Sequence, residues 1–174
     1  MRSGGRRTRT TLLVVLAVVA IALLAVFGLR SKHSTPKAPE LPTEALVGHG
    51  VTLPSVLASA DGRPSLVLFW ASWCGPCVRE APAIQAFSQS SEGRGRIVGV
   101  NWSDALSNAR SFVRRFQWTF PNQRDGDGTV GNDYHLTNLP TTFVLNSRGH
   151  ITATLRGAQT EAALKGAMEA AEGR

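Results

Sequence analysis

The longest apolar stretch of the chain runs from residue 11 to residue 29 and contains no Asp, Glu, Lys or Arg. As a helix rising about 1.5 Å per residue, this stretch spans about 28 Å, close to the ~30 Å hydrocarbon layer of a bilayer. Four arginines precede it, while Arg30 and Lys32 follow it. This asymmetry favours a cytoplasmic N-terminus. We therefore predict a cytoplasmic basic tail over residues 1–10, a transmembrane anchor over residues 11–29, and the remaining chain outside the membrane.

A cleaved signal peptide is the alternative for this stretch. Its apolar region is usually ~7–15 residues long and ends in a small-x-small site, whereas this one is longer and ends Val26-Phe27-Gly28-Leu29-Arg30. Residues 30–45 follow, and they carry three prolines among polar residues. Such a composition is typical of an extended, semi-rigid linker. We expect one folded domain over residues 46–174, since about 130 residues suffice for one hydrophobic core.

The apolar positions of this domain change their period along the chain. Continuous apolar runs at residues 65–70 and 97–102 predict buried strands. Apolar residues at helical spacing predict helices over residues 76–88 and 104–116, the second capped by Asp104. Further on, the sequence predicts a short helix, a hairpin of two strands and a final helix, over residues 129–135, 142–146, 150–156 and 159–171. Strands that alternate with helices before an antiparallel pair indicate an α/β fold, with helices on both faces of a sheet.

The net charge of +7 is concentrated near the N-terminus. Residues 1–45 hold seven Lys or Arg and two acidic residues, whereas residues 46–174 hold twelve and ten, so the two parts carry +5 and +2. Nucleic-acid binding needs a basic face with aromatic platforms in the folded part. We expect no nucleic-acid partner, because membrane topology accounts for the basic tail.

The chain has two cysteines, Cys74 and Cys77, where the predicted strand 65–70 gives way to the predicted helix 76–88. Structural disulfides of exported proteins usually join distant segments, and so small a loop constrains the unfolded chain little. The unpaired N–H groups and the dipole of a helix N-terminus favour a thiolate at the first cysteine. Pro76 suits the first turn, where an N–H would have no partner anyway. The pattern predicts a redox pair in which Cys74 is the nucleophile and Cys77 resolves a mixed disulfide.

Two other interpretations of the pair remain open from the residues alone. A zinc site needs two more soft ligands, and the four histidines lie scattered, at positions 33, 49, 135 and 150. An inert disulfide is the second interpretation. We expect neither a metal nor a cofactor.

Four features of the chain resemble the thioredoxin family. They are the segment Phe69-Trp70-Ala71-Ser72-Trp73-Cys74-Gly75-Pro76-Cys77, Pro82 five residues further on, the loop Leu139-Pro140-Thr141-Thr142-Phe143, and Gly157. The predicted anchor, the linker and the extra helical segment over residues 104–135 further resemble the extracytoplasmic TlpA/ResA/DsbE-like branch of membrane-anchored thiol-disulfide oxidoreductases.

This resemblance implies a thioredoxin fold, a central mixed sheet with helices on both faces, and catalytic roles for Cys74, Cys77 and a cis Pro140 beside the disulfide. It also implies substrate contacts from the residues around the pair and the proline, namely Trp73, Gly75, Pro76, Leu139 and Thr141. A cis proline bends the chain and leaves neighbouring backbone groups free to pair with an extended substrate. An ordinary loop proline is the alternative.

One departure from thioredoxin concerns a proton acceptor. Cytoplasmic thioredoxins have a buried aspartate where this chain has Leu68. Glu80 lies three residues after Cys77 on the same predicted helix face, and the branch often places an acid there. We predict that Glu80 is buried near the pair and takes a proton from Cys77. A solvated Glu80 on the helix surface is the alternative.

The resemblance implies an enzyme that reduces disulfides in exported proteins, for example apocytochrome c before haem attachment, with electrons from a membrane thiol-electron transporter. An oxidant that forms disulfides is the alternative within the same class, because direction depends on the relative stability of the two redox forms. A Sco-like copper chaperone shares the fold, but that family uses C-x-x-x-C with a distal histidine, and the spacer here is one residue shorter. A peroxidase is disfavoured, since no P-x-x-x-T-x-x-C segment is present.

Overall fold

The computed structural model describes residue 19 and residues 35–172. The chain divides into two units, residues 1–34 and residues 35–174, and the second unit holds the domain. The predicted basic tail and, apart from Val19, the predicted anchor lie outside the described residues, as does the first part of the linker. Among the residues that are described, no helix is both long and apolar enough to cross a membrane.

The domain is built on a mixed sheet of six strands in the order β1-β4-β3-β2-β5-β6. The strands are β1 (Glu44–Ala45), β2 (Ser65–Trp70), β3 (Ile97–Trp102), β4 (Asn122–Asp125), β5 (Thr141–Leu145) and β6 (Ile151–Arg156). β2, β3 and β4 run parallel, whereas β5 is antiparallel to both β2 and β6. The carboxyl ends of the three parallel strands therefore meet at one edge, where α/β sheets commonly place their sites.

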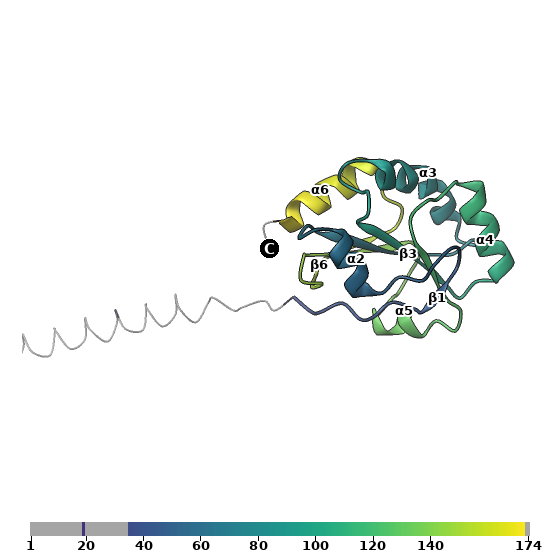
Figure 1. Ribbon diagram of the computed structural model, residues 1–174, viewed down its shortest axis with the longest axis horizontal. Coiled ribbons are helices and arrows are strands. Elements are labelled where there is room, and N and C mark those ends of the chain that lie inside the picture. Colours follow the sequence, from purple (N-terminus) through teal and green to yellow (C-terminus); the bar gives the residue numbers. More distant parts are fainter. Residues whose placement is uncertain (1–18, 20–34, 173–174) are drawn as a thin grey trace, which may run out of the picture. The chain divides into compact units, whose positions relative to one another are not determined.

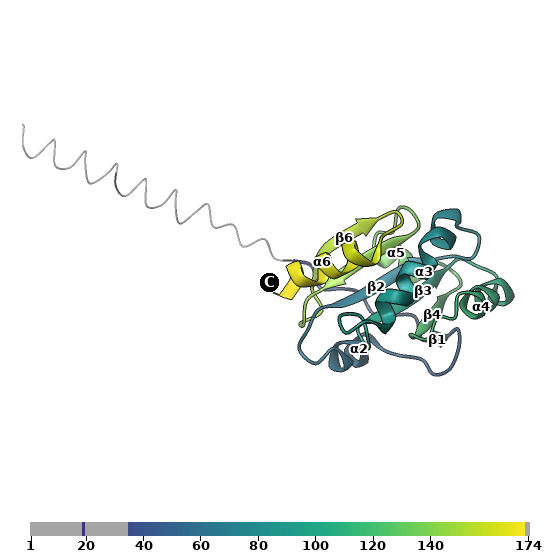
Figure 2. The ribbon, with the colours of Figure 1, turned by 90° about the horizontal axis from the view of Figure 1, so that it is seen from above.

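Helices cover both faces of the sheet, as the sequence predicted (Figures 1 and 2). They are α2 (Leu53–Ser59), α3 (Gly75–Gln89), α4 (Leu106–Arg115), α5 (Thr129–Asp133) and α6 (Glu161–Glu172). β2 shows why two layers are needed, because all six of its side chains are buried and successive side chains of a strand point to opposite faces. Leu66, Leu68 and Trp70 pack in the cluster with α3, α4 and α6, while Val67 and Phe69 pack in the cluster with α2.

Residues 36–45, which the sequence analysis assigned to the linker, pack on the domain. The N–H of Ala38 donates to the Gly149 carbonyl at 2.8 Å, and the N–H of Ile151 donates to the Pro36 carbonyl at 2.8 Å. Glu44 and Ala45 then form β1 at the far edge of the sheet, antiparallel to β4. The physical reason is that both sheet edges offer unpaired backbone groups, which this segment satisfies. In the structure the domain thus begins at residue 35 rather than residue 46.

The expected cap of α4 is wrong. α4 begins at Leu106, its N-cap is Ala105, and no side chain caps it. Asp104 lies one residue too early, and its carboxylate accepts hydrogen bonds from Ser72 and Asn101 instead. The acidic side chain therefore joins the end of β3 to the segment before Cys74 rather than capping a helix.

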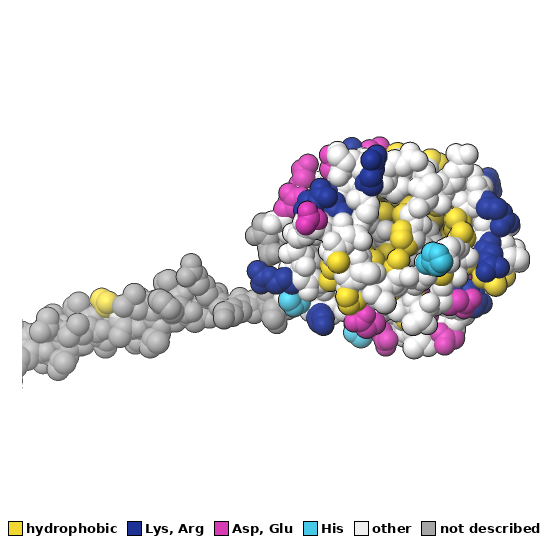
Figure 3. All heavy atoms as spheres, viewed as in Figure 1, with side chains coloured by type: hydrophobic (Ala, Val, Ile, Leu, Met, Phe, Trp, Pro, Cys, Tyr) yellow, Lys and Arg dark blue, Asp and Glu magenta, His cyan; other side chains and the backbone are white. Residues whose placement is uncertain are grey.

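Charged side chains of both signs are spread over the surface of the domain (Figure 3). The basic ones include exposed Arg114 and Arg115 on α4, whereas the acidic residues Glu161 and Glu172 lie on α6. Lys165 pairs with Glu161 at 2.9 Å, a helical neighbour pair.

Candidate active site

Cys74 and Cys77 form a disulfide at the start of α3, with their Cα atoms 5.2 Å apart. Cys74 is the N-cap of the helix, and its Sγ accepts a hydrogen bond from the N–H of Cys77 at 3.1 Å. This contact and the helix dipole both stabilise negative charge on Cys74 once the pair is reduced. Pro76, in the first turn, removes an N–H that would otherwise lack a partner.

The two cysteines differ in access. Cys77 is fully buried, whereas Cys74 keeps 4% of its surface exposed and lines a pocket of about 410 Å³. The pocket is formed by three segments, which are residues 73–76, Trp102 at the end of β3, and residues 136–139 before β5. It thus brings together five residues that the sequence proposed for the site, namely Trp73, Cys74, Gly75, Pro76 and Leu139.

Trp102, Leu136, Thr137 and Asn138 were not predicted as site residues. Trp102 ends a strand parallel to β2, so its position beside Cys74 follows from the adjacent carboxyl ends of the two strands. The sequence contained this signal, but using it required knowing which strands are neighbours. Residues 136–138 have no such signal apart from directly preceding the proline loop.

The Leu139–Pro140 bond is cis, as the sequence resemblance implied. Pro140 is buried, and its carbonyl accepts a hydrogen bond from the N–H of Gly157 at 2.9 Å. Gly157 has a φ of +80°, a left-handed conformation that glycine adopts without strain. The side chain of Thr141 is buried and donates to the Asn138 carbonyl at 2.8 Å. Of the proline loop, Leu139 lines the pocket, whereas Pro140 and Thr141, which the resemblance also proposed for the site, do not.

Glu80 is buried, so the alternative of a solvated side chain is wrong. It is 3% exposed and lies on the buried face of α3 that also carries Cys77, Ala81 and Ile84. Its Oε2 accepts a hydrogen bond from the N–H of Gln159 at 2.9 Å, whereas Oε1 has no hydrogen-bond partner. Burial raises the pKa of Glu80 to about 7, against the opposing effect of the Gln159 bond.

A model of the AhpC/TSA family matches residues 35–154. The chain belongs to this family. Among its relatives, the sporulation thiol-disulfide oxidoreductase A of Bacillus subtilis is 31% identical over 137 residues, which are 74% of this chain and 80% of that protein. The thiol-disulfide oxidoreductase ResA of Geobacillus thermodenitrificans is 32% identical over 114 residues, 65% of this chain and 66% of that protein.

Solved structures of family relatives share the fold. The crystal structure of StoA from Bacillus subtilis superimposes with a TM-score of 0.63 at 28% identity, over 75% of this chain and 96% of that one. A putative thiol:disulfide interchange protein DsbE from Chlorobium tepidum gives a TM-score of 0.67 at 26% identity, over 79% and 96%. This AhpC/TSA-family chain is thus a thiol-disulfide oxidoreductase of the ResA/DsbE type, with a thioredoxin-like fold and a C-x-x-C pair.

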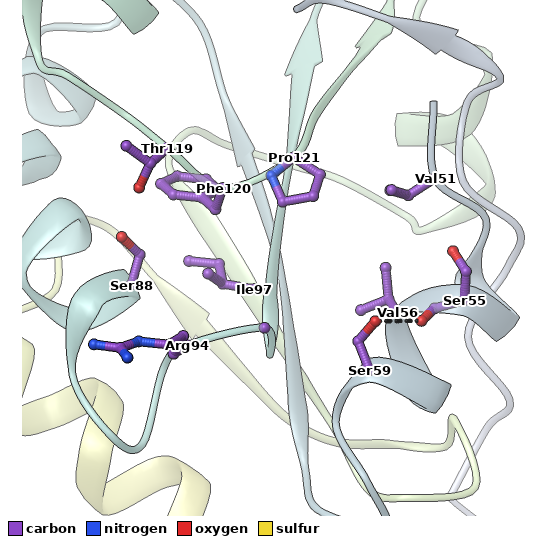
Figure 4. Close-up of a pocket in the computed structure, with 11 residues that line it drawn as sticks. Val51, Ser55, Val56, Ser59, Ser88, Arg94, Ile97, Thr119, Phe120 and Pro121 are labelled. Atoms are coloured by element: carbon purple, nitrogen blue, oxygen red, sulfur yellow. Dashed lines mark hydrogen bonds between the residues drawn. The ribbon is translucent and has the colours of Figure 1, made fainter. Parts of the chain in front are cut away.

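The domain has a second cavity, with a volume of about 260 Å³. This cavity lies near the amino ends of β3 and β4, at the end of the sheet away from the cysteine pair (Figure 4). Its serine hydroxyls already have local acceptors. Ser55 donates to the Thr52 carbonyl, Ser59 to the Ser55 carbonyl and Ser88 to the Gln85 carbonyl, all within 2.9 Å. These donors are engaged, so the cavity is not a candidate active site. Within residue 19 and residues 35–172, no group of three or more His, Cys, Asp or Glu could hold a metal ion.

Proposed function

We propose that this oxidoreductase reduces disulfides in exported proteins, with Cys74 as the nucleophile and Cys77 as the resolving thiol. The observation that carries the assignment is the difference in access between the two sulfurs. Cys74 lines the pocket, whereas Cys77 is fully buried beneath the first turn of α3. A protein substrate can reach only the first of them, so the mixed disulfide forms at Cys74.

The reaction transfers two electrons from the cysteine pair to the substrate. The Cys74 thiolate attacks one sulfur of the substrate disulfide, forms a mixed disulfide and releases the other sulfur as a thiolate. Cys77 then loses its proton and attacks the Cys74 sulfur. This closes the Cys74–Cys77 disulfide and releases the second substrate thiolate. The substrate has then gained two electrons, and its two thiolates are protonated by the one proton that Cys77 gave up and by one proton from water. The structure holds the enzyme in the oxidised form that this step produces.

Glu80 is the proposed proton acceptor for Cys77. The two side chains share the buried face of α3 at a spacing of three residues, which makes them neighbours on a helix. A carboxyl group with a pKa of about 7 exists in both protonation states near neutral pH, which suits a general base that later returns its proton. The unpartnered Oε1 leaves one oxygen available for this exchange.

The proposed substrate is an extended polypeptide that lies across the pocket. Trp73 and Leu139 contribute apolar surface to the pocket that Cys74 lines, together with Gly75 and Pro76. Thr141 and Pro140 support the loop that carries Leu139. A pocket with apolar walls beside a cis-proline loop suits an extended peptide, whose side chains fill the pocket.

The proposed location is the outer face of a cell membrane, with a single N-terminal anchor. The support is the sequence pattern of residues 1–32, in which basic residues precede an uncharged apolar stretch. Electrons would come from a membrane thiol-electron transporter, and apocytochrome c is the proposed substrate of this branch. Protease added to intact spheroplasts should remove the domain. Finding the mature N-terminus beyond Leu29 would replace the anchor with a cleaved signal.

A trapping experiment tests the assignment of the two cysteines. The full-length Cys77→Ser protein, reduced and mixed with a peptide that carries an oxidised Cys-x-x-Cys-His segment, should accumulate a mixed disulfide at Cys74, because the resolving thiol is absent. Cys74→Ser is the matched control and should trap nothing. Trapping by Cys74→Ser, or first alkylation at Cys77 in the reduced wild type, would contradict the assignment.

A further inference from the structure

The turn between β3 and α4 contacts the segment that leads into Cys74. Asp104 is 8% exposed, and its carboxylate accepts three hydrogen bonds. Oδ2 accepts from the N–H of Ser72 at 2.6 Å and from Nδ2 of Asn101 at 2.9 Å, and Oδ1 accepts from the Ser72 hydroxyl at 2.8 Å. Two of these bonds hold Ser72, which stands two residues before Cys74. The charge on the acceptor makes such bonds stronger than neutral ones.

The neighbouring residue of the same turn holds Trp73. The carbonyl of Ser103 accepts a hydrogen bond from Trp73 Nε1 at 3.1 Å. Ser103 has a φ of 46°, a left-handed conformation that a serine adopts at some cost. Its N–H donates to the Asp125 carbonyl at 2.9 Å, which fixes the turn from the other side. The strained residue thus aims its carbonyl at the indole.

The side chain of Trp73 is exposed to solvent and is also fixed by its hydrogen bond to Ser103. It is 59% exposed, one of the few large apolar side chains exposed among residues 35–172. Its ring lies 6.2 Å from the ring of Trp102, centroid to centroid, and both rings line the pocket beside Cys74. An exposed indole that was free to rotate would lose that freedom whenever a substrate packed against it, which weakens binding.

We propose that Asp104 is a positioning residue, which holds Ser72 and Trp73 so that Trp73 stands as a fixed wall of the substrate pocket before the substrate arrives. This role rests on the proposed function, since it concerns the binding of a polypeptide beside Cys74. It predicts that Asp104 governs KM for a polypeptide more than kcat. A small disulfide reagent that needs no wall is insensitive to Asp104.

Two substitutions at Asp104 separate geometry from charge. Asp104→Ala removes all three acceptors. Asp104→Asn keeps an oxygen for the Ser72 N–H, and its amide nitrogen can donate to the Ser72 hydroxyl, which accepts as readily as it donates. Trp73→Phe removes the bond to Ser103 and keeps an apolar ring. Trp118→Phe is its matched control, because Trp118 Nε1 also donates to a backbone carbonyl, that of Ala81 at 3.0 Å, but outside the pocket.

The experiment measures the single-turnover oxidation of each full-length variant, reduced beforehand and held in detergent micelles, by a peptide disulfide and by 5,5′-dithiobis(2-nitrobenzoate). The plateau of the rate against substrate concentration gives kcat, and the half-saturating concentration gives KM. Asp104→Ala and Trp73→Phe should raise the peptide KM about tenfold, as expected when one side chain must be ordered on binding. For Asp104→Ala, which lies outside the pocket lining, kcat and the rate with the small reagent should stay within about twofold of wild type. Asp104→Asn and Trp118→Phe should keep the wild-type KM within the same margin.

A spectroscopic readout tests the positioning without any substrate. In protein labelled with 5-fluorotryptophan, the ¹⁹F resonance of Trp73, assigned by its loss in Trp73→Phe, should shift and change width in Asp104→Ala and return in Asp104→Asn. An unchanged resonance and an unchanged peptide KM in Asp104→Ala would overturn the proposal. The proposal would also be overturned if Asp104→Asn raised the peptide KM as much as Asp104→Ala while its Trp73 resonance stayed at the wild-type position. In that case the charge of Asp104, and not the position of Trp73, would be responsible. Wild-type protein that reduces no peptide would instead overturn the proposed function and the KM role with it, while the resonance still decides whether Asp104 orders Trp73.

Discussion

At the scale of single residues, Glu80 is a carboxyl group whose surroundings differ strongly from water. It has one hydrogen bond, from Gln159, and one carboxylate oxygen without a partner, in a setting that is 3% exposed. Structural carboxylates of folded proteins usually gain partners that lower the pKa, whereas burial here raises it. Groups shifted toward neutral pH in this way gather at functional sites.

Glu80→Gln should change the pH dependence of peptide reduction. Removing the proton of Cys77 requires ionised Glu80, so the wild-type rate should rise with pH through about 7, the pKa of Glu80. The variant should lack this inflection and react about a hundredfold more slowly at pH 8, as for one general base. Glu169→Gln on the exposed side of α6 is the control. A pH–rate profile that Glu80→Gln leaves unchanged would remove Glu80 from the mechanism.

The same carboxyl group should make the stability of the domain depend on pH. Its pKa is about 7 in the folded protein and 4.5 as the ordinary value, so between these pH values the folded state holds a proton that the unfolded chain has lost. Stability therefore falls as pH rises through this window, by about 3 kcal/mol in total. In urea unfolding, the free energy of unfolding of Glu80→Gln relative to that of wild type should therefore be higher at pH 8 than at pH 4.5, because glutamine does not titrate. An equal difference at both pH values would contradict the burial of an ionisable Glu80.

At the scale of elements, α4 lacks a side-chain cap, because Ala105 occupies its N-cap position. Ala105 is exposed and extended, with φ −70° and ψ 128°, so a serine there can accept from the first turn without strain. Ala105→Ser should raise the free energy of unfolding by about 1 kcal/mol. The same substitution inside a helix, Ala86→Ser on the exposed side of α3, should lower it by about 0.5 kcal/mol. Urea unfolding measures both, and equal effects would contradict the cap geometry.

The elements that sequence reasoning found have apolar periodicity, and β4, which it missed, has none. It also missed α2, although the buried residues Leu53 and Val56 stand at helical spacing. β2 and β3 read directly as apolar runs, and β3 has the predicted bounds of residues 97–102. β4 was not predicted, because its sequence, Asn-Gln-Arg-Asp from Asn122 to Asp125, is entirely polar. Its Gln123 is buried because Nε2 donates to the carbonyls of Pro42 and Val51, partners about 75 residues away along the chain. Such long-range satisfaction has no local signal.

At the scale of the whole molecule, the segment before β1 belongs to the fold. Ala38 and Leu41 are buried, and Tyr134 donates its hydroxyl to the Pro39 carbonyl at 2.8 Å. Three prolines among polar residues suggested a semi-rigid linker. The proline carbonyls remain acceptors, however, and the domain uses those of Pro36, Pro39 and Pro42. The boundary at residue 46 could not be corrected from sequence, since the donors come from distant elements.

Leu41→Ala should therefore destabilise the domain. Leu41 is buried in the cluster that contains α2, so its truncation should lower the free energy of unfolding by about 2–4 kcal/mol. Val47→Ala is the matched control, because Val47 is half exposed, and it should cost less than about 0.5 kcal/mol. Denaturant unfolding of the two variants measures the difference. Equal, small losses would mean that residues 36–45 act as a linker after all.

The candidate site was predictable where a local motif carried it. The cysteine pair, Pro76, the proline loop and Glu80 each stand in a short segment whose residue types imply a role. Trp102 and Asp104 stand about thirty residues away from Cys74 along the chain. Only the pairing of β2 with β3 brings Trp102 to the pocket and Asp104 to Ser72. Sequence reasoning thus found the reacting groups and missed the residues that surround and hold them.

The reduction potential of the Cys74–Cys77 pair tests the central claim most directly. The full-length protein is equilibrated in redox buffers of defined ratio, and the fraction of each form is read after thiol alkylation. A reductant of exported proteins should titrate as one two-electron couple with a midpoint near that of thioredoxin, about −270 mV. A midpoint near about −120 mV, as for a strong oxidant, would contradict the account and identify the enzyme as one that forms disulfides.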